Sequence, residues 1–248
     1  MSDPAIELDA LAVFSHPDDA ELSVAGTLLK LKSLGYRIGV ADMTRGEMGT
    51  RGTPELRARE ALEAARVMNL DVRINLERPD GHVWPDEESR QAVVRIIRSY
   101  RPRVLMTTHW DDPHPDHANT CRIVREAARL ATMARYDAEA GQQPARMPAL
   151  MHSIYSRLVI PSFIVDVSDF VGEKMTAIKA HASQFYSAES TERVTRISAE
   201  GFLEQIELRM RYYGSMIGVS AGEAFYVREA LNVEDPVQLL TRPMNIYS

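Results

Sequence analysis

The chain has 248 residues, of which 45% are hydrophobic and 26% are charged, an ordinary globular mixture with enough apolar material for a sizeable core. Its 29 lysines and arginines stand against 35 aspartates and glutamates, and this net charge of −6 argues against a nucleic-acid or anionic-membrane partner. No apolar stretch approaches the roughly 20 residues that span a bilayer, so we expect no membrane segment.

The first half of the chain alternates strand-like apolar runs with helical patterns. In chain order, the predicted strands and helices are residues 10–15, 20–35, 37–44, 53–69, 72–75, 86–100, 103–109 and 117–136. Gly35 is a suitable C-terminal cap for the first helix, and Thr53 followed by Pro54 is a typical start for the second. Strand–helix units repeated four times predict an α/β fold, a Rossmann-like and mostly parallel sheet with helices on both faces.

The second half, residues 137–248, is less regular. Its predicted elements are a polar linker or flap at 137–148, strands within 151–156 and 163–167, a helix at 169–181, an exposed loop at 182–200 and a helix to about residue 213. No internal repeat or strong boundary is visible. We therefore expect a single domain of residues 1–248, in which residues 1–136 form the β-α core and residues 137–248 complete the fold.

Two segments rich in histidine and aspartate follow two of the predicted strands. "SHPDDAE" begins at residue 15, after the first strand, and "THWDDPHPDH" begins at residue 108, after the fourth. In an open sheet of the usual order 3-2-1-4, the first and fourth strands are neighbours, and the crevice at their carboxyl ends is where such folds bind ligands. The two segments are therefore expected to converge at that crevice.

The residues of these segments suit a catalytic zinc site, which needs three nitrogen or oxygen ligands and an open position. His16 and Asp19 can reach one metal ion from a single turn, and His117 can complete the set from the other segment. Asp18 would then remain free to act as a general base close to the bound water. His114 could donate a proton or stabilise a developing oxyanion.

Asp116 could orient a ligand histidine from behind, as carboxylates near metal-binding imidazoles commonly do. The alternative for residues 18–21 is an acidic helix N-terminus favoured by the helix dipole, with an unrelated polar loop at 110–117. The presence of both segments at adjacent strand ends favours the metal site over this alternative.

The motifs "HPDDAELSVAGTL" and "HPDH" resemble the LmbE-like, or PIG-L, family of zinc-dependent N-deacetylases, which hydrolyse N-acetyl groups of N-acetylglucosamine conjugates. The resemblance implies one zinc ion per chain, with another divalent metal as the alternative. It assigns His16, Asp19 and His117 as ligands, Asp18 as general base and His114 as electrostatic or acid partner. It further implies a small-molecule substrate, an N-acetylated amino-sugar conjugate, and a homo-oligomer, with the hexamer as one candidate.

Residues 44–61, 78–83, 114–119 and 174–185 resemble the family branch that acts in bacillithiol biosynthesis on N-acetylglucosaminyl-malate. Arg57 matches an arginine that contacts the substrate there, and a dicarboxylate suits a bidentate guanidinium. The competing interpretation of Arg57 is an exposed arginine in the first turn of a helix. Two departures concern the branch: Pro113 stands where arginine is common, and Phe202 aligns with a tyrosine that assists the oxyanion in relatives.

Other functions remain as alternatives. A deacetylase of another N-acetylated sugar or small-molecule conjugate would use the same site. A nucleotide- or sugar-binding Rossmann-like module without catalysis is disfavoured, because the first strand–helix turn lacks G-x-G-x-x-G and carries acids where a phosphate needs amides. A metal-dependent phosphoesterase is disfavoured because two-metal sites need more bridging ligands.

Localisation follows from two negative signals. The single cysteine, Cys121, excludes an internal disulfide framework and fits a reducing compartment. The first 14 residues lack a basic start and carry three acids, so they are not expected to be a signal peptide. The expected location is the cytoplasm.

Overall fold

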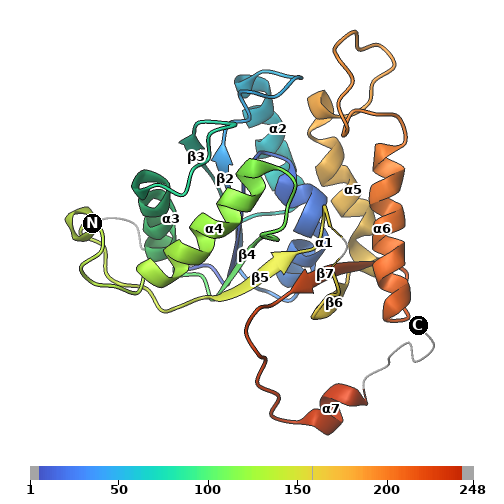
Figure 1. The fold of residues 1–248 in the computed structure, drawn as a ribbon. Helices are drawn as coiled ribbons and strands as arrows, with labels where there is room; N and C mark the ends of the chain where they lie inside the picture. The colour runs from blue at the N-terminus through green and yellow to red at the C-terminus, as the bar shows by residue number, and fades with distance from the viewer. Residues whose placement is uncertain (1–5, 158, 242–248) are drawn as a thin grey trace.

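A seven-stranded sheet runs through the computed structural model, which describes residues 6–157 and 159–241 (Figure 1). Its strands are β1 Ala10–Phe14, β2 Ile38–Thr44, β3 Val72–Arg78, β4 Val104–Thr108, β5 Ala149–Ser153, β6 Phe163–Asp166 and β7 Gly222–Tyr226. The order is β3-β2-β1-β4-β5-β7-β6. All pairs from β3 to β5 are parallel, whereas β7 pairs antiparallel with both β5 and β6. The predicted mostly parallel sheet with the order 3-2-1-4 is confirmed.

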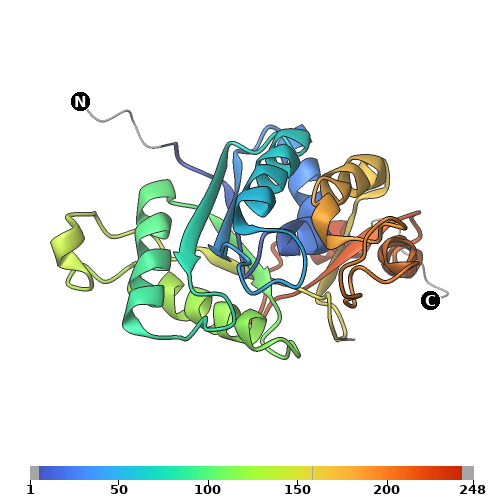
Figure 2. The same cartoon turned by 90° about the horizontal axis from the view of Figure 1, so that it is seen from above.

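Helices cover both faces of the sheet (Figure 2). They are α1 Asp19–Ser33, α2 Pro54–Val67, α3 Glu87–Tyr100, α4 Pro115–Leu130, α5 Val171–Lys179, α6 Phe202–Met216 and the short α7 Pro236–Leu240. Helices α3 and α4 pack together on one face, and α1, α2 and α5 pack together on the other. Among these helices, none is both long and apolar enough to cross a membrane.

Alternate residues of β1 face opposite sides of the sheet and therefore belong to different cores. Leu11 packs in a cluster with α3 and α4 side chains such as Val93. Phe14 packs in a second cluster with Leu28 of α1 and Ala177 of α5. Because both sides of β1 are buried, the strand itself carries apolar side chains, and the polar groups follow it in the loop at its carboxyl end.

The helix ends explain where the site residues lie. Thr53 caps α2 by accepting a hydrogen bond from the Leu56 N–H, with Pro54 in the first turn, as the sequence predicts. Helix α4 begins at Pro115 rather than 117 and ends at Leu130 rather than 136. The earlier start comes from His114, whose ring accepts the Asp116 N–H and so caps the helix.

Strand β7 and helix α7 were not expected from the sequence. Strand β7 contains the buried Glu223, which accepts hydrogen bonds from the N–H groups of Gly26 and Thr27 in the middle of α1. The ammonium of Lys174, from α5, lies 2.6 Å from the Glu223 carboxylate and also donates to the Leu22 carbonyl. A Cβ on Gly26 would come within 2.9 Å of Glu223, so the glycine permits this approach. A buried ion pair thus joins β7, α1 and α5.

Two expectations extend beyond the described residues. Residues 1–5, at the start of the segment not expected to be a signal peptide, lie outside them. The prediction of a single domain includes residues 1–5 and 242–248 and stays a prediction.

Candidate metal and catalytic site

A cavity of about 540 Å³ lies at the carboxyl ends of the parallel strands. Its walls come from the loops after β1, β2, β3 and β4, together with Tyr155 after β5 and residues 195–197 ahead of α6. The hydroxyl groups of Ser15 and Thr120 lie 2.8 Å apart and tie the loop after β1 to α4. The two histidine- and aspartate-rich segments therefore converge, because the order of β1 and β4 in the sheet brings them together.

His16, Asp19 and His117 present three ligand atoms toward one point. Asp19 Oδ2 lies 3.2 Å from His16 Nδ1 and 3.2 Å from His117 Nε2. The two imidazole nitrogens lie 3.3 Å from each other. Two imidazole nitrogens and one carboxylate oxygen form a donor set that suits zinc and leaves a coordination position open. These three residues fit a bound divalent cation.

Carboxylates hold the outer nitrogens of both imidazoles. His16 Nε2 lies 3.0 Å from Asp80 Oδ1, and His117 Nδ1 lies 3.1 Å from Asp112 Oδ1. Metal-binding histidines characteristically donate their second N–H to such a partner, which fixes the tautomer and leaves the other nitrogen free to coordinate. The sequence alone indicates no role for Asp80 or Asp112, although Asp112 lies inside the motif "THWDDPHPDH".

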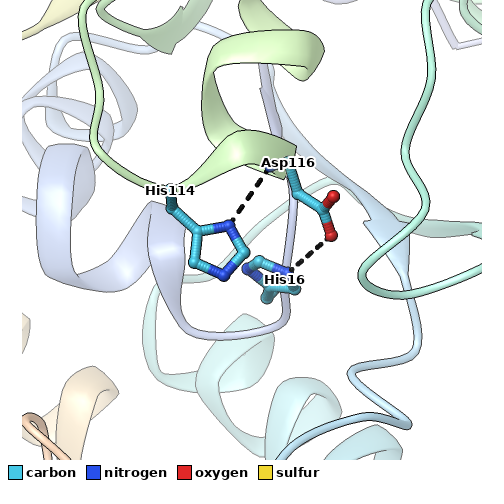
Figure 3. Close-up of side chains that lie close together, drawn as sticks. All are labelled: His16, His114 and Asp116. Atoms are coloured by element: carbon cyan, nitrogen blue, oxygen red, sulfur yellow. Dashed lines mark hydrogen bonds and ion pairs between the residues drawn. The ribbon is translucent and has the colours of Figure 1, made fainter.

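Asp116 also faces His16, with Oδ2 3.5 Å from His16 Nε2 (Figure 3). Its carboxylate accepts the N–H groups of Gly81 and Val83, so it fixes the loop after β3 beside the site. Burial lowers the pKa of His117, but Asp19 and hydrogen bonds to Asp112 and Asp19 raise it to about 9. The carboxylates therefore make this point favourable for positive charge.

His114 is exposed and lines the same cavity. Its ring lies beside that of His16 (Figure 3). Its ring stacks on that of His117, with centroids 4.6 Å apart. Burial, followed by the charges of His117 and His16, lowers the pKa of His114. Because Nδ1 accepts the Asp116 N–H, the neutral ring carries its proton on Nε2 and can donate a hydrogen bond there.

Asp18 adjoins the ligand set in an unusual backbone conformation. Its φ is 124°, a region that residues other than glycine rarely adopt, and its side chain does not cap α1. The residue is only 4% exposed, and burial raises the pKa of its carboxyl to about 6 against the opposing charge of Arg57. Such strain is typical of functional sites whose surroundings hold a side chain in place.

Arg57 is buried, at 4% exposure, so the interpretation of an exposed helix arginine is wrong. Its guanidinium lines the cavity and donates to the carbonyls of Gly46 and Pro17 and to Asp18 Oδ2, the last at 3.3 Å. A Cβ on Gly46, whose φ is 69°, would come within 2.0 Å of this guanidinium. Contact between Arg57 and a substrate stays a prediction.

Several known proteins are similar to this chain. The PIG-L family, GlcNAc-PI de-N-acetylase, matches residues 11–128. The diacetylchitobiose deacetylase of Thermococcus kodakarensis is 31% identical over 84% of this chain and 78% of that protein. The chain belongs to the PIG-L family. A probable N-acetyl-alpha-D-glucosaminyl L-malate deacetylase 2 of Bacillus anthracis is 27% identical over 81% of this chain and 91% of that one. The crystal structure of a conserved protein from Thermus thermophilus is also similar, with 35% identity, a TM-score of 0.81 and coverage of 91% and 97% of the two chains.

Phe202 aligns with a tyrosine of relatives in the PIG-L family, and the positions of two aromatic residues show whether another tyrosine lies near the site. Phe202 is buried beside Phe185 and is not among the residues that line the cavity. The tyrosine that does line it is Tyr155, whose ring lies 4.8 Å from the Arg209 guanidinium and whose pKa is raised by burial. The sequence alone gives no sign of this position, because Tyr155 follows β5 in a segment without a motif.

Replacing Asp112 by asparagine should weaken metal binding by the PIG-L site about 10–100-fold, the usual effect of losing a carboxylate behind a ligand histidine. The amide cannot hold the His117 N–H as strongly as the carboxylate 3.1 Å away does. Competition titration with a zinc chelator measures the change. Asp111→Asn is the matched control, since Asp111 is exposed and contacts neither ligand histidine. Equal zinc affinities for the two variants would contradict the assignment.

Proposed function

We propose that this protein is a zinc-dependent N-deacetylase that hydrolyses the N-acetyl group of an N-acetylglucosaminyl conjugate. The observation that carries the proposal is the cluster of His16, Asp19 and His117, with Asp18 beside it, in one cavity. Two PIG-L relatives named as deacetylases of N-acetylated sugars support the choice of reaction. The single, buried cysteine supports a cytoplasmic location.

Different residues of the chain carry out different steps of the proposed hydrolysis. A zinc ion held by the ligand set supplies Lewis acidity toward water and the acetyl carbonyl. Asp18 accepts a proton from the water that attacks the carbonyl carbon. The Nε2–H of His114 stabilises the charge that develops on the carbonyl oxygen. When the C–N bond breaks, the proton taken from water passes to the nitrogen, and the products are acetate and a free amine.

The proposed substrate is N-acetylglucosaminyl-malate. A cavity of about 540 Å³ is of the size that binds small ligands. Arg51, Arg57 and Arg196 line it, as do the aspartates around the histidines, and these three guanidiniums are the groups that an anionic aglycone would meet. The similarity to a malate-conjugate deacetylase supports this choice, and the similarity to a diacetylchitobiose deacetylase makes a second amino sugar the alternative aglycone.

A substrate panel tests both parts of the proposal. Purified protein with stoichiometric zinc should release acetate from N-acetylglucosaminyl-malate faster than from free N-acetylglucosamine, its inositol conjugate or diacetylchitobiose. A chelator should abolish release, and added zinc should restore it. Preference for another conjugate would correct the aglycone alone, whereas phosphate release from a generic ester with no acetate release would exclude a deacetylase.

The proposed role of Arg57 in binding has its own test. If it grips the aglycone carboxylates, Arg57→Ala should raise KM for N-acetylglucosaminyl-malate about 10-fold or more, the value of a charged hydrogen bond, and change KM for free N-acetylglucosamine little. Loss of its bond to Asp18 would instead lower kcat for both substrates alike. Equal effects on the two substrates would therefore make Arg57 a positioning residue for Asp18.

A further inference from the structure

Residues 228–241, which follow β7, form an arm that extends away from the other helices and strands of its own chain (Figure 1). Every residue from 228 to 241 is exposed, and Figure 1 shows α7 standing apart from the other elements. Five large apolar side chains of the arm are 44–69% exposed: Leu231, Val233, Val237, Leu239 and Leu240. An isolated five-residue helix is not stable in water, so the arm's conformation needs a surface that covers these side chains.

A groove of matching chemistry lies on the face covered by α3 and α4. This α3–α4 groove is an open cavity of about 850 Å³, and Leu130, Met147 and Leu150 supply its apolar lining. Arg125 and Arg129 line it as well, and within the described residues no carboxylate lies at ion-pairing distance from either. The groove therefore offers an apolar surface bordered by two arginines that lack an ionic partner.

The arm complements this groove in charge. It carries Glu229, Glu234 and Asp235 against a single arginine, Arg228. The start of the arm, which we call its root, also lies at the groove of its own chain, because Glu229 is one of the lining residues. The remainder of the arm leads away from this groove. The eight residues ahead of α7 can span up to roughly 26 Å when extended, which is enough to reach a neighbouring molecule.

We propose that the arm binds a second copy of this chain and lays its apolar side chains in the partner's α3–α4 groove. The root of each arm lies at its own groove, so two chains related by a two-fold axis can exchange arms, each acidic arm meeting the other's unpaired arginines. The contact is isologous, because each chain supplies one arm and one groove. This assembly does not depend on the deacetylase activity.

Truncation provides the first test. The full chain at micromolar concentration should sediment as a dimer or a multiple of one, and a chain that ends at Val227 should sediment at a lower mass. Val227 itself is held by hydrogen bonds with Ser162, so the cut leaves β7 anchored. A monomeric full chain, or an unchanged mass after truncation, would overturn the proposal.

Charge reversal separates exchange between chains from docking within one chain. The arm variant Glu229→Arg/Glu234→Arg and the groove variant Arg125→Glu/Arg129→Glu should each dissociate at least 10-fold more readily than the wild type. An equimolar mixture should recover the dimer, because one contact is then wild-type and the other has its charges exchanged. Arg211→Glu, on exposed α6 surface, is the control and should leave the mass unchanged. Failure of the mixture to recover would assign the arm to its own groove and overturn exchange.

Discussion

Replacing Asp18 by asparagine should lower kcat about 10²–10⁴-fold while zinc stays bound, because a positioned general base contributes about that much. Asparagine keeps the size of the side chain and tolerates a positive φ better than most residues, so the backbone at 124° should persist. The variant loses the ability to accept the water proton, whereas its amide oxygen can still accept the hydrogen bond from Arg57. Zinc content by mass spectrometry and kcat on the preferred substrate measure the two effects separately.

The neighbouring substitution is the matched comparison. Asp19→Asn removes the anionic oxygen that lies 3.2 Å from both His16 Nδ1 and His117 Nε2. Zinc affinity and activity should therefore fall together in this variant, and excess zinc should restore part of the activity. If Asp18→Asn loses the metal instead, or turns over at a near-normal rate, the roles given to the two aspartates are incorrect.

Replacing Glu223 by alanine should destabilise the protein by about 3–5 kcal/mol, the usual cost of leaving one member of a buried ion pair uncompensated. The ammonium of Lys174, 1% exposed, would lose its carboxylate, and the Gly26 and Thr27 N–H groups would lose an acceptor. For a protein of this length the corresponding fall in Tm is roughly 6–20 °C. Thermal and urea unfolding followed by circular dichroism measure it.

Two variants make this result interpretable. Glu204→Ala removes an exposed glutamate of α6 and should change stability by no more than about 0.5 kcal/mol. The double change Lys174→Met/Glu223→Gln removes both charges but retains an oxygen that accepts from α1, so it should be less destabilising than Glu223→Ala alone. A double variant as unstable as the single one would show that the charge of Lys174 is not the cause.

The sequence predicts the part of the fold and site that follows from local chemistry. Apolar runs mark the first four strands, Thr53 and Pro54 mark a helix start, and the order of parallel strands brings the segments of His16 and His117 together. The seven predicted site residues all lie at or beside one cavity, although their roles stay predictions. The order of the strands in the sheet is therefore enough to predict where the site lies, without knowledge of any side-chain contact.

What the sequence could not predict depends on contacts between distant segments. Strand β7 is short and contains Glu223, and a charged residue does not predict a buried strand. Only the structure shows that Lys174 and N–H groups of α1 compensate the charge of this glutamate. Asp80 reaches His16 only because of the path of the loop after β3. Arg57 is buried because its helix face turns toward Asp18, which no pattern within α2 indicates.

The separation of the proposed ligand residues in the chain would set an order of events during synthesis. His16 and His117 are 101 residues apart, yet their nitrogens meet at 3.3 Å. At about 5–20 residues per second, the ribosome needs roughly 5–20 s to produce the second histidine after the first. Throughout that interval the nascent chain offers a cation only two of the three proposed ligands, the imidazole of His16 and the carboxylate of Asp19. A cation that needs all three donors could be retained only once β4 has joined β1, so its capture would report that these two strands have paired.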